Sequence, residues 1–270
     1  MPALSEFHKP TDLSAALALL RRKRPRTVPL AGGTWLNPRI GKEVPAEAVV
    51  DLSGLGLGQV ERDGDTLRLG AMATLADVTE DETCRSLAGG ILAQTARRDA
   101  TVNVRNAATV GGTVVVAPVD SEFILALLAL GAELSVQSAK TATWPLHRFL
   151  ADPATALDDG LVTQVQIRLP ARATEGLARV ARTPADHSIV AAVAVVASNP
   201  DVVRVALGGV SPRPLLVEFD RPETAEQAVA QAIAAAEAYA DFRGTADYRR
   251  AMGAVMARRA LEVALQERNR

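Results

Sequence analysis

The sequence predicts an α+β protein of three successive parts, and three observations lead to this fold class. Short aliphatic runs that end in Gly, Pro or Asp alternate with amphipathic helical segments up to about residue 172. Two of these runs lead into the same Gly-Gly-Thr sequence, at 32–34 and 111–113. Beyond about residue 175, a strand hairpin and two long helices replace the alternation. We therefore expect the parts to span residues 1–56, 57–172 and 173–270.

The first part is expected to be a small α/β unit. Thr11 is a suitable N-cap for a short amphipathic helix, whose apolar residues from Leu13 to Leu20 recur at helical spacing. The basic run 21–26, which contains Pro25, ends this helix. The remaining elements are a strand at 27–30, a turn at 31–34 and a second strand at 48–52.

The second part is expected to combine a hairpin, helices and two further strands. The hairpin turns at 63–65, and a helix begins at Thr74, where Asp77 completes a capping box. Val110-Gly111-Gly112 is interpreted as a strand that ends in a turn. The expected elements are strands at 58–61, 66–69, 132–137 and 161–169, a helix at 84–100, and a buried helix at 123–130 that is apolar all round.

The third part is expected to pair two strands and add two helices. Gly208-Gly209 is interpreted as a structural turn at the end of the strand hairpin. In the last helix, the face formed by Tyr248, Met252, Val255 and Met256 is assigned to the core. The expected elements are strands at 189–197 and 202–207 around the turn 199–201, and helices at 224–239 and 245–267.

The composition excludes several kinds of site. The 30 basic and 31 acidic residues give a net charge of −1, which creates no field for nucleic acid or anionic lipid. The single cysteine, Cys84, cannot ligate an iron-sulfur cluster, and the three histidines lack metal-ligand spacing. No stretch reaches the roughly 20 apolar residues that span a bilayer, and no signal segment begins the chain. We expect a cytoplasmic protein with no metal site and no membrane insertion.

The two Gly-Gly-Thr sequences are the strongest candidates for a binding site. Paired glycines allow positive φ, so successive backbone amides can converge on one anion. Either sequence alone predicts only a turn, but the repeat favours one diphosphate held between two loops with hydroxyl donors. Neither sequence has Gly-x-Gly-x-x-Gly spacing, and neither is expected to open directly into a helix. A Rossmann or P-loop site is therefore disfavoured.

At these turns the sequence resembles the FAD-binding subunit or domain of the xanthine dehydrogenase and aerobic carbon monoxide dehydrogenase family, which are molybdenum hydroxylases. The resemblance covers nearly the whole chain. The matching motifs are Phe7-x-x-Pro10, Ala31-Gly32-Gly33-Thr34, Lys42-x-x-Pro45, Val50-Asp51-Leu52-Ser53, Leu69-Gly70-Ala71 with Thr74, Val104-Arg105-Asn106-x-Ala108-Thr109-Val110-Gly111-Gly112, Ala126-Leu127-Leu128-Ala129-Leu130, Ala206-Leu207-Gly208-Gly209-Val210, Asp247-Tyr248-Arg249-Arg250 and Arg258-Arg259-Ala260.

The resemblance implies a vanillyl-alcohol-oxidase-like (PCMH-type) FAD domain of two α+β halves, followed by a smaller C-terminal domain of antiparallel sheet and helices. The glycine turns of the family wrap the FAD diphosphate. Trp35 stands where the family usually has a small polar or acidic residue, Thr113 replaces a frequent Asn, and Val114 to Val116 replace a more polar run. The implied contact residues are Ala31, Gly32, Gly33, Thr34, Trp35, Leu36, Thr109, Gly111, Gly112 and Thr113.

The resemblance also implies four outlying contacts, each with a plainer alternative. Glu122 matches an acidic residue that bonds cofactor hydroxyls, and it could equally be an acid placed at a helix N-terminus. Leu161 matches a residue near the flavin ring, for which core packing is the simpler account. Arg182 and Asp186 correspond to a segment with a basic residue near the ring, and a surface ion pair is the alternative.

In the family, substrate is hydroxylated at molybdenum in a large partner subunit, and electrons reach FAD through a small partner with two 2Fe-2S clusters. The resemblance therefore implies an oxidoreductase subunit that passes electrons to NAD, a quinone or oxygen, with no catalytic acid or base of its own. A degenerate, non-redox scaffold and a freestanding FAD oxidoreductase remain alternatives. Gly32→Val or Gly112→Val is expected to remove FAD while leaving the fold largely intact.

Overall fold

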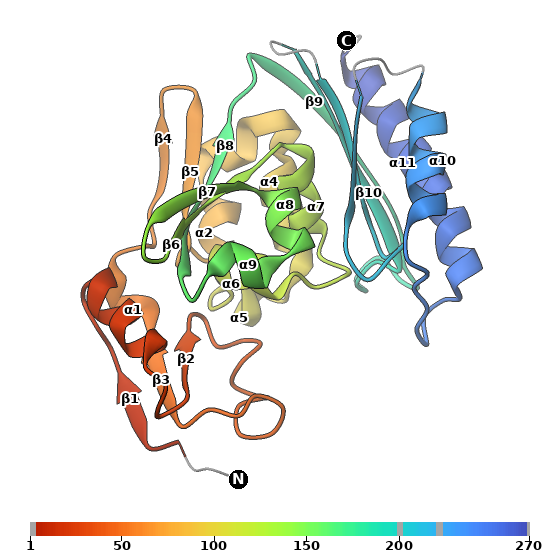
Figure 1. The fold of residues 1–270 in the computed structure, drawn as a ribbon. Coiled ribbons are helices and arrows are strands. Elements are labelled where there is room, and N and C mark those ends of the chain that lie inside the picture. The colour runs from red at the N-terminus through yellow and green to blue at the C-terminus, as the bar shows by residue number, and fades with distance from the viewer. Residues whose placement is uncertain (1–3, 199–201, 220–223, 269–270) are drawn as a thin grey trace.

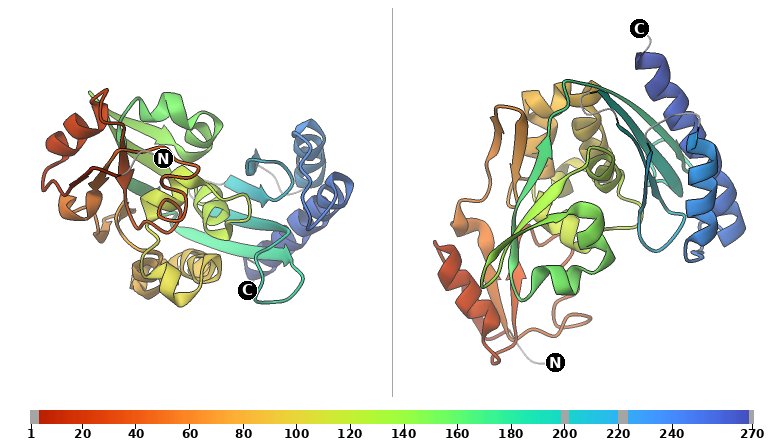
Figure 2. Two further views of the ribbon diagram at one scale, coloured as in Figure 1. Left: turned by 90° about the horizontal axis from the view of Figure 1, so that it is seen from below. Right: turned by 45° about the horizontal axis from the view of Figure 1, so that its top comes forward.

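Three β-sheets in chain order organise the computed structural model of this protein (Figure 1). The structure describes residues 4–198, 202–219 and 224–268. The N-terminal sheet and the C-terminal helices lie at opposite ends of the molecule, with the central sheet and its helices between them (Figure 2). The expected turn at 199–201 lies outside the described residues.

The N-terminal sheet is parallel, with the strand order β1-β3-β2. Its strands are β1 (Glu6–His8), β2 (Thr27–Leu30) and β3 (Ala48–Asp51), accompanied by α1 (Leu13–Arg21) and the 3-10 turn η1 (Leu52–Leu55). The N-cap of α1 is Asp12 rather than Thr11, because the Asp12 carboxylate accepts the Ala15 amide at 2.8 Å. β1 was not expected, since three residues are too few to show strand periodicity.

The central sheet is antiparallel, with the strand order β4-β5-β8-β6-β7. Its strands are β4 (Val60–Asp63), β5 (Thr66–Gly70), β6 (Glu133–Gln137), β7 (Thr141–Pro145) and β8 (Leu161–Arg168), and the short helices α8 (Leu146–Ala151) and α9 (Pro153–Leu157) connect β7 to β8. The expected hairpin is confirmed, because Asp63 pairs with Thr66 across a two-residue turn. β7 is largely exposed and was not predicted.

Helices pack beside the central sheet, and two predictions about them have different outcomes. α2 (Leu75–Glu80) begins after Thr74 with the predicted capping box to Asp77. The single helix expected at 84–100 is wrong, because positive φ at Ala88, Gly89 and Gly90 breaks it. The segment forms α3 (Glu82–Ser86), the 3-10 turn η2 (Leu87–Gly90) and α4 (Ile91–Asp99).

The second Gly-Gly-Thr sequence also differs from its prediction. Thr109 ends no strand: its hydroxyl caps α6 (Val110–Val116) by accepting the Gly112 amide at 3.1 Å. Gly111 and Gly112 therefore lie in the first turn of a helix, which follows the short α5 (Val102–Arg105). The apolar residues beside Thr109 suggested a strand, but a Thr hydroxyl also satisfies a helix N-terminus.

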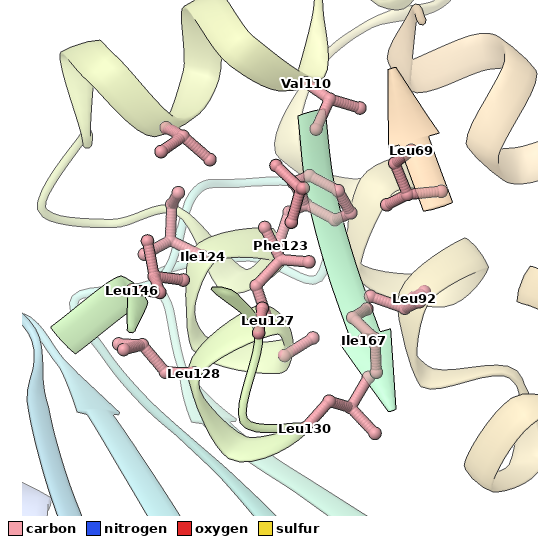
Figure 3. Packing of buried hydrophobic residues seen from close by; sticks show 14 of the residues in the cluster. Leu69, Leu92, Val110, Phe123, Ile124, Leu127, Leu128, Leu130, Leu146 and Ile167 are labelled. Atoms are coloured by element: carbon pink, nitrogen blue, oxygen red, sulfur yellow. The ribbon is translucent and has the colours of Figure 1, made fainter. Parts of the chain in front are cut away.

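α7 (Glu122–Ala129) is the centre of the larger core, and every one of its residues is buried, as predicted from its apolar circumference. Figure 3 shows Phe123, Leu127 and Leu128 of this helix among side chains of α4, β5 and β8. Long aliphatic side chains surround α7 on all sides. The helix thereby links the central sheet to the C-terminal sheet.

The C-terminal sheet has the antiparallel order β12-β11-β10-β9 and is buried on both faces. Alternate residues of β10 face different cores: Val193 and Val195 pack toward α7, whereas Ala194 and Val196 pack toward the C-terminal helices. The edge strands β9 and β12 were not predicted. The elements are β9 (Arg172–Val180), β10 (Val190–Ser198), β11 (Val202–Gly208), β12 (Leu215–Phe219), α10 (Ala225–Ala235) and α11 (Ala246–Arg268).

The predicted apolar face of α11 packs on this sheet. Met256 is buried, and Met252 and Val255 are partly buried against the same cluster. Tyr248, in contrast, remains 39% exposed at the start of the helix.

Arg249 of α11 is buried completely and clamps the turn before the helix. Its guanidinium pairs with Asp241 and donates to the carbonyls of Ile189 at 2.5 Å and Gly209 at 2.9 Å. Hydrogen bonds from Arg249 and Arg243 hold the pKa of the Asp241 carboxyl well below its usual range, against the opposing effect of burial. One side chain thus ties α11 to the ends of β10 and β11.

Arg249→Leu is expected to lower the free energy of unfolding by about 3–5 kcal/mol, because it removes one of the two arginines that pair with Asp241 and leaves two buried backbone carbonyls without their donor. Denaturant unfolding measures the change. The control is Arg258→Leu, whose ion pair with Glu262 is exposed and 3.8 Å long, and which should change stability by less than about 1 kcal/mol. Equal effects of the two substitutions would contradict the clamp.

Candidate functional site

A cavity of about 210 Å³ lies between the loop after β2 and the N-terminus of α6. It brings together both Gly-Gly-Thr sequences, which lie almost eighty residues apart in the chain. Of the residues predicted for the cofactor site, Ala31, Gly32, Gly33, Thr34, Trp35, Leu36, Thr109, Gly112 and Thr113 line this cavity. The sequence therefore identified both walls of one hollow.

Gly32 brings the two walls into contact. A Cβ atom at this position would lie 1.6 Å from the carbonyl oxygen of Ala107 and 3.3 Å from the Cα of Ala108. No side chain fits at such a separation, so a glycine is required for the loop to approach the segment before α6. The expectation that Gly32→Val leaves the fold intact is therefore wrong, since the clash is with backbone.

The first loop carries unused hydrogen-bond donors. Gly33 has φ of +70°, and its carbonyl accepts the Asn37 amide at 2.9 Å, which closes the loop on itself. Within the described part of the chain, the backbone amides of residues 32–36 donate no hydrogen bond. Successive backbone amides without an internal acceptor can form a concave site for an anion. This geometry fits the predicted role of the loop.

The amides of the second glycine pair are already in use. Gly111 donates to the Ala71 carbonyl at 2.8 Å, and the Gly112 amide meets the Thr109 hydroxyl at 3.1 Å. We expected free amides on both sides of the site, and this expectation is wrong for the side formed by α6. Gly111 does not line the cavity but packs on Ala71, where a Cβ would lie 2.7 Å from the Ala71 Cβ.

Gly112 contributes space rather than donors. A Cβ at this position would meet the Thr109 hydroxyl at 2.9 Å and the Cβ of Ala31 at 3.8 Å, so it would enter the gap between the two walls. Thr34 and Thr113 line the cavity, and among the residues described their hydroxyls make no hydrogen bond. The second wall thus offers an open surface with one available hydroxyl.

Glu122 lies outside the cavity, at the first position of α7. Its side chain is 3% exposed. The Oε1 atom accepts a hydrogen bond from Nε of Arg179 in β9 at 2.6 Å, and the Oε2 atom lies 3.9 Å from Nη1 of Arg98. Its second oxygen, Oε2, has no hydrogen-bond partner among the described atoms. Glu122 therefore joins α7 to the C-terminal sheet, a contact that neither sequence interpretation included.

The other three predicted residues are separate from the cavity. Leu161 is 6% exposed and packs in the N-terminal core cluster. Arg182 is exposed, with its guanidinium 5.8 Å from the ring centre of Phe242, while the Asp186 carboxylate accepts the Thr183 amide at 3.1 Å. Among the described residues, no ion pair joins Arg182 to Asp186, so the alternative of a surface pair is wrong.

Asp99 lines the cavity and was not identified from the sequence. Its carboxyl is partly buried at the end of α4, where it is hydrogen-bonded to the Ser121 hydroxyl and accepts the Phe123 amide at 3.2 Å. Burial raises the pKa of Asp99 to about 7; the charge of Glu122 adds to the rise, and these hydrogen bonds oppose it. Its partners lie more than twenty residues away, so no local pattern marks it.

The donors around the cavity suit the binding of an anion. Residues with free backbone amides and two threonines line one hollow. Within the part of the chain that the structure covers, no group of three or more His, Cys, Asp or Glu side chains could hold a metal ion. Within those same residues, no helix has both the length and the apolar character needed to cross a bilayer.

Comparisons with known proteins identify the family of this chain. Residues 3–171 match the family described as the FAD binding domain in molybdopterin dehydrogenase. The uncharacterized protein YgfM of Escherichia coli K12 is 32% identical over 261 residues, which cover 94% of this chain and 93% of that protein. The carbon monoxide dehydrogenase medium chain of Hydrogenophaga pseudoflava is 28% identical over 98% of both chains.

Solved structures confirm the predicted fold class. A carbon monoxide dehydrogenase from Hydrogenophaga pseudoflava, lacking the Mo-pyranopterin moiety of its cofactor, superposes with a TM-score of 0.84 at 24% identity, covering 98% of this chain and 99% of that one. Quinoline 2-oxidoreductase from Pseudomonas putida 86 gives 0.82 at 25% identity and 98% coverage of both chains. The arrangement of three sheets is therefore one that solved proteins share.

Asp99→Asn is expected to stabilise the protein at pH 8 and to have a smaller effect at pH 5. The folded state binds a proton at Asp99 up to about pH 7, whereas an unfolded carboxyl releases it near pH 4. The free energy of unfolding therefore falls as pH rises from about 4 to 7. Above pH 7, Asp99 is ionised in both states and lowers the free energy of unfolding no further. The gain should be at most a few kcal/mol, at about 1.4 kcal/mol per pKa unit.

Thermal unfolding at both pH values measures this difference. Asp159→Asn, which alters an exposed carboxylate in a turn, is the matched control. A gain for Asp99→Asn that does not change between pH 5 and pH 8 would contradict the linkage.

Proposed function

We propose that this chain, which belongs to the family of FAD-binding domains of molybdopterin dehydrogenases, holds the diphosphate of one FAD between the loop 31–36 and α6. The observation that carries the proposal is the cavity in which both Gly-Gly-Thr sequences meet, with the amides of 32–36 free to donate. FAD is the cofactor of this flavoprotein family, and the free donors match an anionic diphosphate.

The dimensions of the cavity fit part of a dinucleotide. Whole-ligand pockets occupy about 300–1,000 Å³, so a hollow of about 210 Å³ accommodates the diphosphate and its neighbouring groups. Thr34 and Thr113 would donate from opposite walls, while Gly112 leaves the gap open. With about fifty heavy atoms and roughly 0.3 kcal/mol per atom, affinity for FAD can be spread over many such contacts.

The remaining candidates would act outside the cavity. We propose that Leu161, Arg182 and Asp186 contact the parts of FAD that extend beyond the diphosphate. Glu122 would contribute by holding Arg179 in place. Gly111 would support the site indirectly, by letting α6 pack on Ala71.

The bound flavin would relay electrons within a larger complex, because it accepts electrons singly and can deliver them in pairs. We propose a molybdopterin-binding large subunit and a small subunit with 2Fe-2S clusters as partners, and NAD, a quinone or oxygen as acceptor. Relatives of similar length are named as medium chains or subunits of carbon monoxide dehydrogenase and nicotine 6-hydroxylase, which supports this assignment. The proposed division remains 1–56 and 57–172 for FAD and 173–270 for the C-terminal domain.

The purified protein should show visible flavin absorption, or acquire it with added FAD at one FAD per chain. A colourless protein that takes up no FAD would favour the degenerate scaffold. Flavoprotein that turns over a small substrate without partner subunits would favour the freestanding oxidoreductase. The structure offers little support for the scaffold, since Trp35 and Val116 line the cavity without closing it.

Gly112→Val is expected to weaken FAD binding at least tenfold while the protein stays folded, because the new side chain enters the gap toward Ala31. Flavin absorption after gel filtration and circular dichroism measure the two effects. The control is Gly58→Val, where a Cβ meets nothing closer than 3.9 Å and φ is not positive. Stoichiometric FAD in the Gly112 variant would mean that the diphosphate lies elsewhere.

A further inference from the structure

Two large hydrophobic side chains are exposed where they line the same cavity. Trp35 belongs to the first loop and is 43% exposed, and Val104 belongs to α5 and is 40% exposed. Exposed apolar side chains scattered singly need no explanation, but two that converge on one hollow mark a surface that something covers. The candidate cofactor site thus has an apolar portion beside its polar donors.

The indole of Trp35 is held in place from one side. The guanidinium of Arg39 lies 4.8 Å from the ring centre, within the range of a cation-π contact. Arg39 in turn donates to the Trp35 carbonyl at 2.9 Å and pairs with Glu43 at 3.3 Å. An aromatic ring ordered before binding loses little entropy when a planar ligand stacks on it.

We propose that Trp35 is the stacking surface for the adenine ring of FAD, and that it makes the site prefer the dinucleotide over FMN. This inference rests on the proposed function. Trp35 lies among the free amides 32–36 that would hold the diphosphate, so the ring that reaches it must be close to the diphosphate. The closed ribose keeps adenine nearer to the phosphates than the five-carbon ribityl chain keeps the flavin ring. Aromatic side chains stack with nucleobases irrespective of sequence.

The variants Trp35→Ala and Trp35→Phe, with Phe7→Ala as control, separate stacking from general effects. Phe7 is an aromatic on β1 that is 59% exposed and does not line the cavity. Trp35→Ala should weaken binding of FAD and of ADP by 5- to 150-fold, about 1–3 kcal/mol, and leave FMN binding nearly unchanged. Trp35→Phe should keep most of the affinity, and Phe7→Ala all of it.

Tryptophan fluorescence gives a second measurement that needs no variant of Trp35. The chain has two tryptophans, so in Trp144→Phe the emission comes from Trp35 alone. ADP added to the FAD-free protein should quench this emission with the affinity found above. Quenching should disappear once FAD is bound, because its adenine would then cover the ring.

Each contrary result overturns a different part of the proposal. Wild-type protein that binds no FAD contradicts the proposed function. Tight FAD binding that Trp35→Ala leaves unchanged overturns only the stacking role. If FAD-loaded protein still binds NADH through Trp35, the ring serves a second nucleotide and the assignment to FAD is overturned. An equal loss of FAD and FMN overturns the preference for the dinucleotide.

Discussion

The approach of Gly32 to the carbonyl of Ala107 is the contact on which the candidate site depends. It lets a loop from the parallel sheet lie directly against the segment that leads into α6, and the cavity exists only because these two backbones meet. The two walls contribute differently: the loop supplies free amides, and the helix supplies an open surface. A dinucleotide bridging them would join the loop after β2 to α6.

Ion pairs hold the residues at the end of the cavity that is lined by Asp99 and Pro118. Two ion pairs tie the residues after Pro118 to the C-terminal part: Arg243 pairs with Asp120 of the loop at 2.9 Å, and Arg179 pairs with Glu122, the first residue of α7, at 2.6 Å. The side chains of both pairs are largely buried, and hydrogen bonds between charged groups are stronger than those between neutral ones. The C-terminal part therefore positions residues beside the site without lining the cavity itself.

Features that depend on neighbouring residues could be predicted from the sequence. Features that depend on contacts between residues far apart in the chain could not. The Thr74 capping box and the all-apolar α7 were predictable because each is determined by a few consecutive residues. Thr109 was misinterpreted because apolar neighbours indicate a strand, while its hydroxyl caps a helix. Asp99 could not be predicted, since its environment comes from a helix more than twenty residues away. The glycine turns were identified by their repetition and by resemblance, not by either sequence alone.

The two-faced burial of β10 bears on how independent the parts of this protein are. The family match ends at residue 171, yet Val193 and Val195 of β10 belong to the same core as α7. A fragment that stops at residue 171 would leave that apolar surface uncovered and prone to association. The C-terminal sheet is thus a shared wall rather than an appended module, and recombination between relatives would have to exchange α7 and β10 together.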